Sequence, residues 1–568
     1  MQDEGYWAKL ATRRVGRRGA LLGTAAAGSG VAAMATVGCG DDDDEVPSQA
    51  AQQPAEKQPK RGGTIVIEVT TGEAPHLDPH QTTTQLLSIR GPGIVYPRVI
   101  RRKLSPDINA TTNIIPDGWL AQSWEQPDDN TYLFKLTPEA KWANVPPVNA
   151  RRITAEDIAY SVTRQIAQRS NAAFIPGYDS VTAVDPATVR LRLKGPDPDF
   201  LMAYCGANNK VVAREAVELK GDLKEGPLVG VAWIMKEWQR SSNVTFVPDP
   251  DYWRKDKFGT KYPYVDRLEL PRISDQSTLL AAFRARKLSN HPMGSKKEAD
   301  DLKRELPSIV VFQEGGAYGP ALPFLMRVDA PPFNDVRVRQ ALMKIVDRPT
   351  MFNLVETTGP ERWAASMLNV NSDSQLLPEE EAKKILGRDV AEAKRLWQAA
   401  GVTNWQPEIF LYDTGAGTQT SATETFQQWM RTELGISSKI TRIDNVKLTN
   451  NFTAGELPNV SGALVPGLIG INSWAQNFLR TGANQNNMKL SDPQLDSLID
   501  AQAKELRNPG RRDDLVKQLL RRLGELATVW GLSIQGQGGT SVAWPEYQGL
   551  YRGRTNEPVY YEEVWIDQ

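Results

Sequence analysis

The sequence has few of the residues that build metal sites or disulfide frameworks. Its 568 residues include two cysteines, Cys39 and Cys205, and three histidines, His76, His80 and His291. Two cysteines allow one disulfide at most, and so few histidines and cysteines disfavour the common kind of zinc site. We therefore expect no metal, no cofactor and no disulfide framework.

The sequence also lacks an excess of either charge. The chain has 67 Lys and Arg residues against 68 Asp and Glu residues. A nucleic-acid-binding surface requires a clustered basic excess, so this class of partner is disfavoured. A serine hydrolase is disfavoured too, because no Gly-x-Ser-x-Gly elbow surrounds a strand–helix turn and the histidines lie in loops or after a helix. An extracellular hydrolase is a remote alternative, and the protein is not expected to be an enzyme.

Length and composition are those of a soluble protein with more than one domain. A chain of 568 residues is too long for one small core and fits two or three domains. Hydrophobic residues make up 40% of the chain, a usual share for a globular protein. The 15 Trp and 15 Tyr residues are available to line a ligand pocket, although aromatic residues are equally routine in cores.

The amino terminus has the organisation of an export signal. Residues 1–18 are polar and end in two arginine pairs, and Gly19–Gly38 is an uncharged segment rich in Ala and Gly. A basic region, a moderately apolar region and a small-residue cleavage site are typical of a signal peptide. A transmembrane helix is the alternative, but so many Gly and Ala residues make a poor span. We assign residues 1–38 to a signal peptide.

Two short motifs refine this assignment. Arg17-Arg-Gly-Ala-Leu-Leu22 resembles a twin-arginine signal, and Val37-Gly-Cys39 resembles a lipobox, with Thr36 where Leu is usual. The lipobox cysteine is lipidated and becomes the first residue, so Cys39 is the predicted lipidation site. Residues 39–60 have no apolar pattern, which predicts a flexible tether. The predicted location is the outer side of the cytoplasmic membrane, in the periplasm or at the cell surface, after export by Tat or Sec.

Strands and helices alternate through the folded part. Thr131–Leu136 follows the turn residues Asp128-Asp-Asn130 and an earlier apolar run, the pattern of a β-hairpin. Thr154 precedes two acidic residues and starts a helix. The strand-like run Ala321–Val328 precedes Asp335–Arg348, whose apolar residues fall at helical spacing while its arginines lie mostly off the buried side. Later alternation predicts a mostly parallel sheet.

Several of these segments resemble a known family. Pro331-Pro-Phe-Asn-Asp-Val-Arg-Val-Arg-Gln-Ala-Leu342, Ile115-Pro-Asp-Gly-Trp-Leu-Ala-Gln-Ser-Trp124 and Val244–Trp253 are similar to segments of the family 5 extracellular solute-binding proteins, the dipeptide, oligopeptide and nickel-binding group of ABC importers. The resemblance covers nearly all of residues 61–568. It implies an α/β fold, the two-lobe periplasmic-binding-protein fold of type II, in the large cluster with an extra subdomain in the first lobe. The ligand cleft would lie between the lobes.

The resemblance also divides the chain. Lobe I would comprise residues 61–320 and lobe II residues 321–534, and residues 535–568 would be a return segment that completes lobe I. Two crossings between the lobes would form a hinge around the ligand.

The function implied is that of a substrate-binding lipoprotein of an ABC importer. It would capture a peptide-like or other small polar solute in the hinged cleft and deliver it to a membrane permease. The expected partners are the solute, the ABC permease subunits and the membrane lipid of the anchor, and the protein is expected to be a monomer. A ligand-sensing surface lipoprotein on the same fold is the alternative, and a permease and an ATPase encoded in the same operon would separate the two.

The resemblance also suggests where a ligand would bind. In relatives that bind short peptides, an acidic residue pairs with the ligand's amino terminus; the equivalent stretch here, residues 466–478, has no acid, and Ile471 stands at that position. A buried ammonium without a counter-charge is unfavourable, so a free α-amine is not expected there. Amides and an indole suit a neutral ligand, such as a sugar or a blocked peptide; alternatively, Trp474 belongs to the core and the amides cap a turn. The candidate ligand-binding residues are Trp142, Trp363, Tyr412, Asp413, Ile471, Asn472, Trp474 and Asn477.

Overall fold

The computed structural model describes most of the chain between residues 57 and 567. The ranges outside the description are 1–56, 70–73, 83–86, 88, 90, 105–114, 169–170, 294, 314–320, 355–362, 364–369, 371, 413–416, 444–459, 463–469, 484, 534–539, 551–556 and 568. The predicted signal peptide, the predicted lipidation site Cys39 and most of the predicted tether therefore lie outside the described residues.

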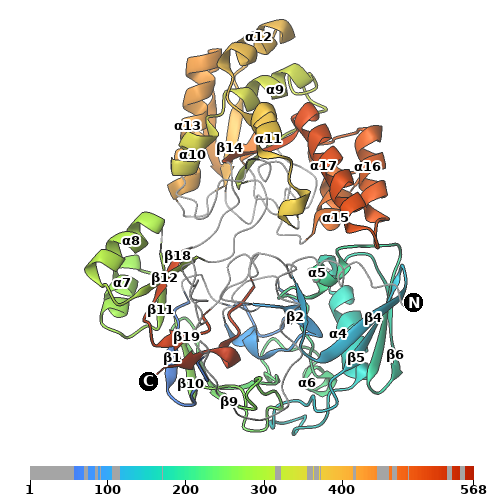
Figure 1. Cartoon of the computed structure of the whole chain (residues 1–568), viewed down its shortest axis with the longest axis vertical. Coiled ribbons are helices and arrows are strands. Elements are labelled where there is room, and N and C mark those ends of the chain that lie inside the picture. Colours follow the sequence, from blue (N-terminus) through green and yellow to red (C-terminus); the bar gives the residue numbers. More distant parts are fainter. Residues whose placement is uncertain are drawn as a thin grey trace, which may run out of the picture.

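The chain folds into two lobes, one above the other in Figure 1. The lower lobe holds the first half of the described chain and, in red, its C-terminal end. Its strands are β1 (Thr64–Val66), β2 (Ile100–Arg102), β3 (Pro116–Gly118), β4 (Ala121–Asp128), β5 (Thr131–Leu136), β6 (Tyr178–Asp185), β7 (Thr188–Leu193), β8 (Trp233–Gln239), β9 (Asn243–Pro248), β10 (Arg267–Pro271), β11 (Asn290–Met293), β12 (Val310–Gln313), β18 (Thr540–Ala543), β19 (Tyr547–Gln548) and β20 (Trp565–Ile566). Its helices are η1 (Pro92–Val95), α4 (Ala155–Ala167), η2 (Ala172–Phe174), α5 (Phe200–Tyr204), α6 (Arg214–Glu218), α7 (Gln276–Arg284), α8 (Lys296–Glu305) and η6 (Tyr561–Glu563).

Two four-stranded sheets organise the lower lobe. One has the order β1–β10–β9–β8 and the other the order β4–β5–β7–β6. The predicted hairpin is confirmed, because β4 and β5 pair antiparallel across the turn that contains Asp129. The predicted start of α4 is confirmed as well: the Asp157 carboxylate accepts a hydrogen bond of 2.8 Å from the backbone N–H of Thr154. Cys205 in the same lobe is a free, fully buried thiol.

The upper lobe is a sheet covered by helices. Its strands are β13 (Ala321–Met326), β14 (Glu408–Tyr412), β15 (Lys439–Ile443), β16 (Val460–Gly462) and β17 (Val529–Ser533), in the order β15–β14–β16–β13–β17. Its helices are α9 (Val336–Lys344), α10 (Arg348–Leu354), η4 (Asp373–Gln375), α11 (Glu379–Leu386), α12 (Val390–Ala400), α13 (Gly417–Leu434), α15 (Ile471–Trp474), the π-helix η5 (Ala475–Leu479), α16 (Pro493–Ala503) and α17 (Pro509–Leu526).

The sheet of the upper lobe corrects one prediction. Strand β14 pairs parallel with β15 and β16, but β13 pairs antiparallel with β16 and β17. The sheet is therefore mixed and not mostly parallel. The two strands that run against their neighbours, β13 and β17, are those by which the chain enters and leaves this lobe.

The segment Asp335–Arg348 corrects a second prediction. The capping residue is Asp335, whose carboxylate accepts a hydrogen bond of 2.9 Å from the backbone N–H of Arg337. The helix ends at Lys344, and α10 begins separately at Arg348. Arg339 was expected off the buried side, but it is 5% exposed, because its guanidinium donates to the backbone carbonyls of Phe333 and Leu526. The stem of a long arginine is apolar enough to be buried when its head finds such acceptors.

Each lobe has its own hydrophobic core. The first core contains residues between Ile65 and Leu270 together with residues between Ala543 and Ile566. The second core runs from Phe324 to Leu532, and a smaller third core lies under α7 and α8. The C-terminal segment thus returns to the lower lobe. The boundaries predicted at 320/321 and 534/535 fall at ranges outside the description and stay predictions.

Buried ion pairs fix the C-terminal segment to the lower lobe. The Arg98 guanidinium contacts the Glu557 carboxylate at 2.6 and 3.1 Å, and Arg102 Nε lies 3.3 Å from the same carboxylate. Arg101 contacts Glu562 at 3.2 Å and also pairs with Glu563. We call these six residues, Arg98, Arg101, Arg102, Glu557, Glu562 and Glu563, the return-segment cluster. Burial opposes ionisation of Glu557, but its two arginine neighbours lower the pKa of that carboxyl below its usual value.

Candidate functional site

The chain crosses between the lobes twice, and the two crossings lie close together. The first runs from β12 to β13 and the second from β17 to β18. Strand β18 pairs antiparallel with both β11 and β12 below, and β17 pairs with β13 above, so the strands that flank the crossings are hydrogen-bonded to one another in each lobe. This arrangement gives the two lobes a common connecting side, at the left of Figure 1.

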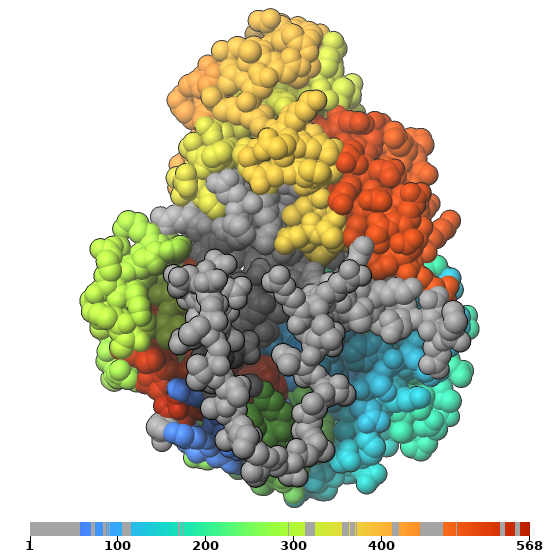
Figure 2. Space-filling view, viewed as in Figure 1, coloured from blue at the N-terminus to red at the C-terminus, as the bar shows by residue number. Residues whose placement is uncertain are grey.

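The lobes also touch on the opposite side of the molecule. Figure 1 places α5 of the lower lobe beneath α15, at the right, and Figure 2 shows the red residues of the upper lobe reaching down towards the cyan residues there. Five buried polar residues meet between these elements: Asp197 and Asp199 from the turn before α5, Asn472 from α15, Gln502 from α16 and Arg512 from α17. We call these five residues the lobe contact.

An ion pair and a set of hydrogen bonds hold the lobe contact together. Arg512 Nη1 lies 2.6 Å from Asp199 Oδ1, and both side chains are fully buried. The other oxygen of Asp199 accepts a hydrogen bond of 2.7 Å from the backbone N–H of Asn472. The Asn472 side-chain amide donates to Asp197 at 3.0 Å and its carbonyl oxygen accepts from Gln502 at 2.7 Å. Gln502 in turn accepts from Arg512 at 3.1 and 3.2 Å, which closes the network.

The electrostatics of the lobe contact are uneven, because two carboxylates face one guanidinium. Burial and the neighbouring charge of Asp199 together raise the pKa of Asp197 to about 6, against the lowering effects of the hydrogen bonds and of Arg512. The Asp197 carboxyl therefore takes up a proton in mildly acidic conditions.

A glycine allows the two lobes to come this close. Gly470, directly before α15, has a φ of +93°, and a Cβ built there would lie 2.6 Å from the Cβ of Asp199. Both the backbone conformation and the close approach exclude other residues at this position. The close approach of Asp199 from the other lobe therefore requires a glycine at position 470.

The structure brings together some of the candidate ligand-binding residues, but mostly in core positions. Ile471 is 0% and Trp474 2% exposed, and both belong to the core of the upper lobe. Trp363 is 8% exposed in the same core, and Trp142 is fully buried in the core of the lower lobe. The indole N–H groups of Trp142 and Trp474 have no hydrogen-bond partner among the described residues.

The remaining candidates are less buried or outside the description. Asn477 is exposed, and its side-chain amide donates to the Ser473 carbonyl at 2.7 Å. Asn472 belongs to the lobe contact. The backbone of Tyr412 ends β14, where it pairs with Ile443, but its side chain and the whole of Asp413 lie outside the described residues.

Sequence reasoning missed Asp197, Asp199, Gln502 and Arg512. Nothing local to the Asp197-Pro-Asp199 turn points to an arginine more than 300 residues later. The one available signal was the absence of acids from residues 466–478, so that a carboxylate acceptor for the buried Asn472 N–H had to come from elsewhere in the chain.

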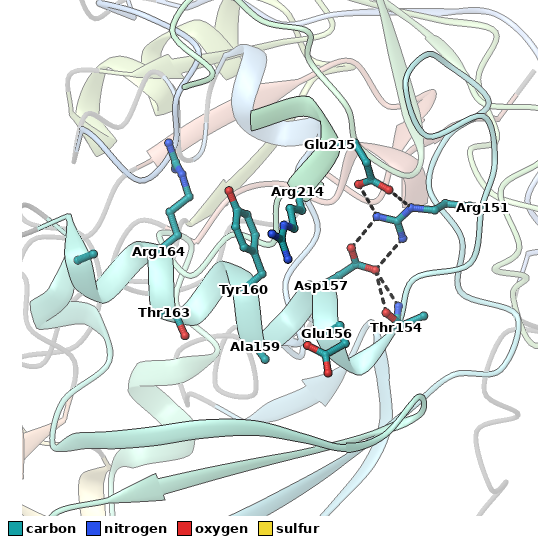
Figure 3. Close-up of a pocket in the computed structure, with 11 residues that line it drawn as sticks. Arg151, Thr154, Glu156, Asp157, Ala159, Tyr160, Thr163, Arg164, Arg214 and Glu215 are labelled. Atoms are coloured by element: carbon teal, nitrogen blue, oxygen red, sulfur yellow. Dashed lines mark hydrogen bonds and ion pairs between the residues drawn. The ribbon is translucent and has the colours of Figure 1, made fainter. Parts of the chain in front are cut away.

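A separate groove lies along α4 and α6 of the lower lobe, with a volume of 590 Å³ (Figure 3). Arg151 bridges Asp157 at 2.7 Å and Glu215 at 2.5 Å beside it. Two further arginines that line it are paired as well, Arg164 with Asp78 and Arg214 with Glu218. None of the predicted ligand-binding residues is among the side chains that line this groove.

The described residues contain no group of three or more His, Cys, Asp and Glu side chains placed to hold a metal ion. No helix among them combines the length and the hydrophobicity needed to cross a membrane.

Comparison with known sequences identifies relatives. The family described as bacterial extracellular solute-binding proteins, family 5 Middle, matches residues 116–488. The periplasmic oligopeptide-binding protein OppA of Escherichia coli (strain K12) is 25% identical over 269 residues, which are 43% of this chain and 47% of that protein. The dipeptide-binding protein DppE of Bacillus subtilis (strain 168) is 23% identical over 441 residues, which are 71% of this chain and 76% of that protein. The match to OppA thus spans less than half of that relative's own length.

Comparison with solved structures identifies the fold. The binding protein MoaA from A. tumefaciens R10, solved in complex with mannopinic acid, superposes with a TM-score of 0.68 at 20% sequence identity. The superposition covers 90% of this chain and 100% of that one. The fold is therefore the two-lobe, type II fold of periplasmic binding proteins, as the sequence predicted.

Proposed function

Since this chain belongs to the family 5 bacterial extracellular solute-binding proteins, we propose that it is the substrate-binding lipoprotein of an ABC importer. The observation that carries the proposal is the match of residues 116–488 to that family on a two-lobe fold whose chain crosses between the lobes twice. The relatives OppA and DppE bind oligopeptides and dipeptides. In this proposal, residues 61–320 and 535–568 form lobe I, residues 321–534 form lobe II, and the solute binds in the cleft between them. The protein works as a monomer that delivers its solute to a permease.

Anchoring follows from the lipobox. Cys39 carries the lipid and residues 39–60 are the tether, so that the two lobes stay at the outer side of the cytoplasmic membrane. The test is to express the full chain and a Cys39→Ala variant in the native host and to separate membranes from soluble protein. The native chain should sediment with the membranes and the variant should not. Equal sedimentation of both would exclude lipid attachment at Cys39.

We further infer that the solute has no free α-amine at the position next to α15. The residue that stands there, Ile471, is fully buried in the core of the upper lobe. The nearest carboxylates of the lobe contact, Asp197 and Asp199, are occupied by Arg512 and by the backbone and side chain of Asn472. A ligand ammonium would have to compete with these intramolecular partners. A neutral or N-blocked ligand would not.

The site residues proposed for such a ligand are Trp142, Trp363, Tyr412, Asp413, Ile471, Asn472, Trp474 and Asn477. Asn477 is exposed and is the most direct contact among them. The buried members Trp142, Ile471 and Trp474 would act mainly by holding the cleft walls in place, since they are at most 2% exposed.

The ligand class is tested with a matched pair of compounds. We propose isothermal titration of the purified full chain with an alanyl dipeptide, with the same dipeptide N-acetylated, and with a disaccharide. The acetylated peptide or the sugar should bind at least about tenfold more tightly than the free dipeptide, a difference of about 1.4 kcal/mol. Tight binding of the free dipeptide would exclude the neutral-ligand proposal but leave the importer role intact. Stimulation of ATP hydrolysis by the reconstituted permease and ATPase, in response to the loaded protein, tests the importer role itself.

A further inference from the structure

The polar residues of the lobe contact are buried where the two lobes meet. Asp197 and Asp199 come from the lower lobe, and Asn472, Gln502 and Arg512 come from the upper lobe. None of the five is more than 6% exposed, and Asp199 and Arg512 are fully buried. If the lobes moved apart, the Asp199–Arg512 ion pair and the hydrogen bonds from Asn472 to the two aspartates would be lost. These interactions are therefore part of the free energy of lobe closure and not of the folding of either lobe alone.

The lobe contact lies on the opposite side of the molecule from the two crossings. Strands β12 and β18, which flank the two crossings in the lower lobe, lie at the left of Figure 1, whereas α5, α15 and α16 lie at the right. When two bodies rotate about a hinge, the points far from the hinge separate most. A contact at this side is broken by a small opening, while contacts beside the crossings persist.

We propose that the lobe contact is a latch, in which the Asp199–Arg512 ion pair and the Asn472 and Gln502 amides hold the two lobes closed before any solute binds. The proposal rests on the hinged two-lobe function proposed above. It adds that the closed form of this protein is held by its own residues between the lobes, so that a solute need not supply all of the free energy of closure. Solute affinity then depends also on Asp199, Gln502 and Arg512, which are not among the residues proposed to bind the solute.

Three observations support a specific latch over an incidental contact. First, the interactions form a closed ring: Asp199 contacts Arg512 and the Asn472 N–H, Asn472 also bonds Gln502, and Gln502 bonds Arg512. The Asn472 amide adds a hydrogen bond to Asp197. Gly470 removes the steric obstacle to the approach of Asp199. The Asp199 carboxylate also uses both of its oxygens on the upper lobe, one on Arg512 and one on the Asn472 N–H.

The charge balance makes the latch sensitive to pH. The charged and titratable groups that face Asp197 are Asp199 on its own turn, Arg512 on α17 and Tyr132 on β5, whose hydroxyl donates to the Asp197 backbone carbonyl at 3.4 Å. In the closed form, burial raises the pKa of Asp197 to about 6, above the usual 3.8 of an aspartate in water. Where opening of the lobes hydrates this carboxyl, closure takes up a proton between about pH 4 and 6, and the latch holds more strongly as the pH falls through this window.

The test compares Arg512→Met with Arg521→Met in the ligand-free full chain. Arg512→Met leaves two carboxylates in the contact without a cation, whereas Arg521 forms its ion pair with Glu381 inside the upper lobe and serves as the control. Small-angle X-ray scattering should show a larger radius of gyration for Arg512→Met alone. Hydrogen exchange at the Asn472 backbone amide should accelerate at least about tenfold in Arg512→Met and remain unchanged in Arg521→Met.

A second variant keeps the test decisive if Arg512→Met folds poorly. The double variant Asp199→Asn/Arg512→Met replaces both charges with neutral groups of similar size, and such replacement of a buried ion pair is often neutral. The double variant should return the radius of gyration and the exchange rate of Asn472 towards the native values. A native radius of gyration in Arg512→Met, with native exchange at Asn472, would overturn the latch. This result would leave solute binding untouched, so the failure of the latch and the failure of the proposed function are distinguishable.

Discussion

The return-segment cluster and the lobe contact both contain buried arginines and carboxylates, but the first connects two segments of one lobe and the second connects the two lobes. The return-segment cluster ties the C-terminal segment to the lobe in which it folds. The lobe contact ties one lobe to the other. The first is expected to stay formed for as long as the protein is folded, and the second is expected to break whenever the lobes part.

Their charge balance differs in the same sense. The return-segment cluster sets three arginines against three glutamates, and the arginines hold the pKa of Glu557 below its usual value. The lobe contact sets one arginine against two aspartates and completes the network with neutral amides, and the pKa of Asp197 is raised to about 6. In the return-segment cluster the charges are matched in number, although burial raises the pKa of Glu562 above its usual value. The lobe contact has one carboxylate more than it has arginines, and the unfavourable burial of the second charge lowers the free energy by which the lobes are held together.

A substitution at Glu557 is the strongest test of the difference between the return-segment cluster and the lobe contact. Glu557→Gln would leave Arg98 and Arg102 buried without their shared carboxylate, and removal of one partner of a buried pair typically costs about 3–5 kcal/mol. We expect the free energy of unfolding, measured by urea denaturation at pH 7, to fall by about this amount. The control is Glu563→Gln, whose side chain is 30% exposed and whose loss water would compensate. An equal decrease in the free energy of unfolding in the two variants would mean that burial does not increase the contribution of these ion pairs to stability.

The second prediction concerns Asp197: at neutral pH its substitution should raise the free energy of unfolding, whereas Glu557→Gln should lower it. The raised pKa means that the protonated form suits the folded, closed protein, so the contribution of this group is fully present below about pH 3.8 and is lost as the pH rises through about 6. Asp197→Asn keeps an acceptor for the Asn472 amide but removes the charge. At pH 7 the variant should be more stable than the native chain by about 1–3 kcal/mol, and the advantage should vanish near pH 4.

Urea unfolding of both proteins at pH 4.5, 6 and 7.5 measures this difference. A constant difference across the three pH values would show that Asp197 does not titrate in this window. A loss of stability in Asp197→Asn at pH 7.5 would show that the carboxylate is net stabilising there, and that the surplus charge of the lobe contact is matched by a partner outside the described residues.

Local features of both lobes could be predicted from the sequence, because each depends on neighbours in the chain. The cap of α4 at Thr154, the hairpin around Asp129 and the cap of α9 at Asp335 are set by side chains within three residues of the backbone groups that they serve. The family, and with it the two-lobe fold, was predictable because its motifs extend over most of the chain.

What could not be predicted depends on contacts between distant residues. Arg98 and Glu557 are separated by 459 positions, and Asn472 and Asp199 by 273. Neither has a local pattern that marks it as buried, since an arginine or an acid is exposed by default. The burial of Arg339 was mispredicted for the same reason, because its acceptors are carbonyls that only the tertiary fold places near its head.

The smallest expected effect comes from the second ion pair between the lobes, Arg507 with Asp129. Its atoms lie 2.9 Å apart, against 2.6 Å in the Asp199–Arg512 pair, but the two side chains are 59% and 52% exposed. Water and salt screen such a pair, so its loss is worth between 0 and about 1 kcal/mol. Arg507→Ala should therefore leave the radius of gyration and the exchange of the Asn472 amide at native values. Opening of the lobes in Arg507→Ala to the extent expected for Arg512→Met would show that closure depends on the number of charges across the interface. The unchanged behaviour that we expect would show that it depends on their burial.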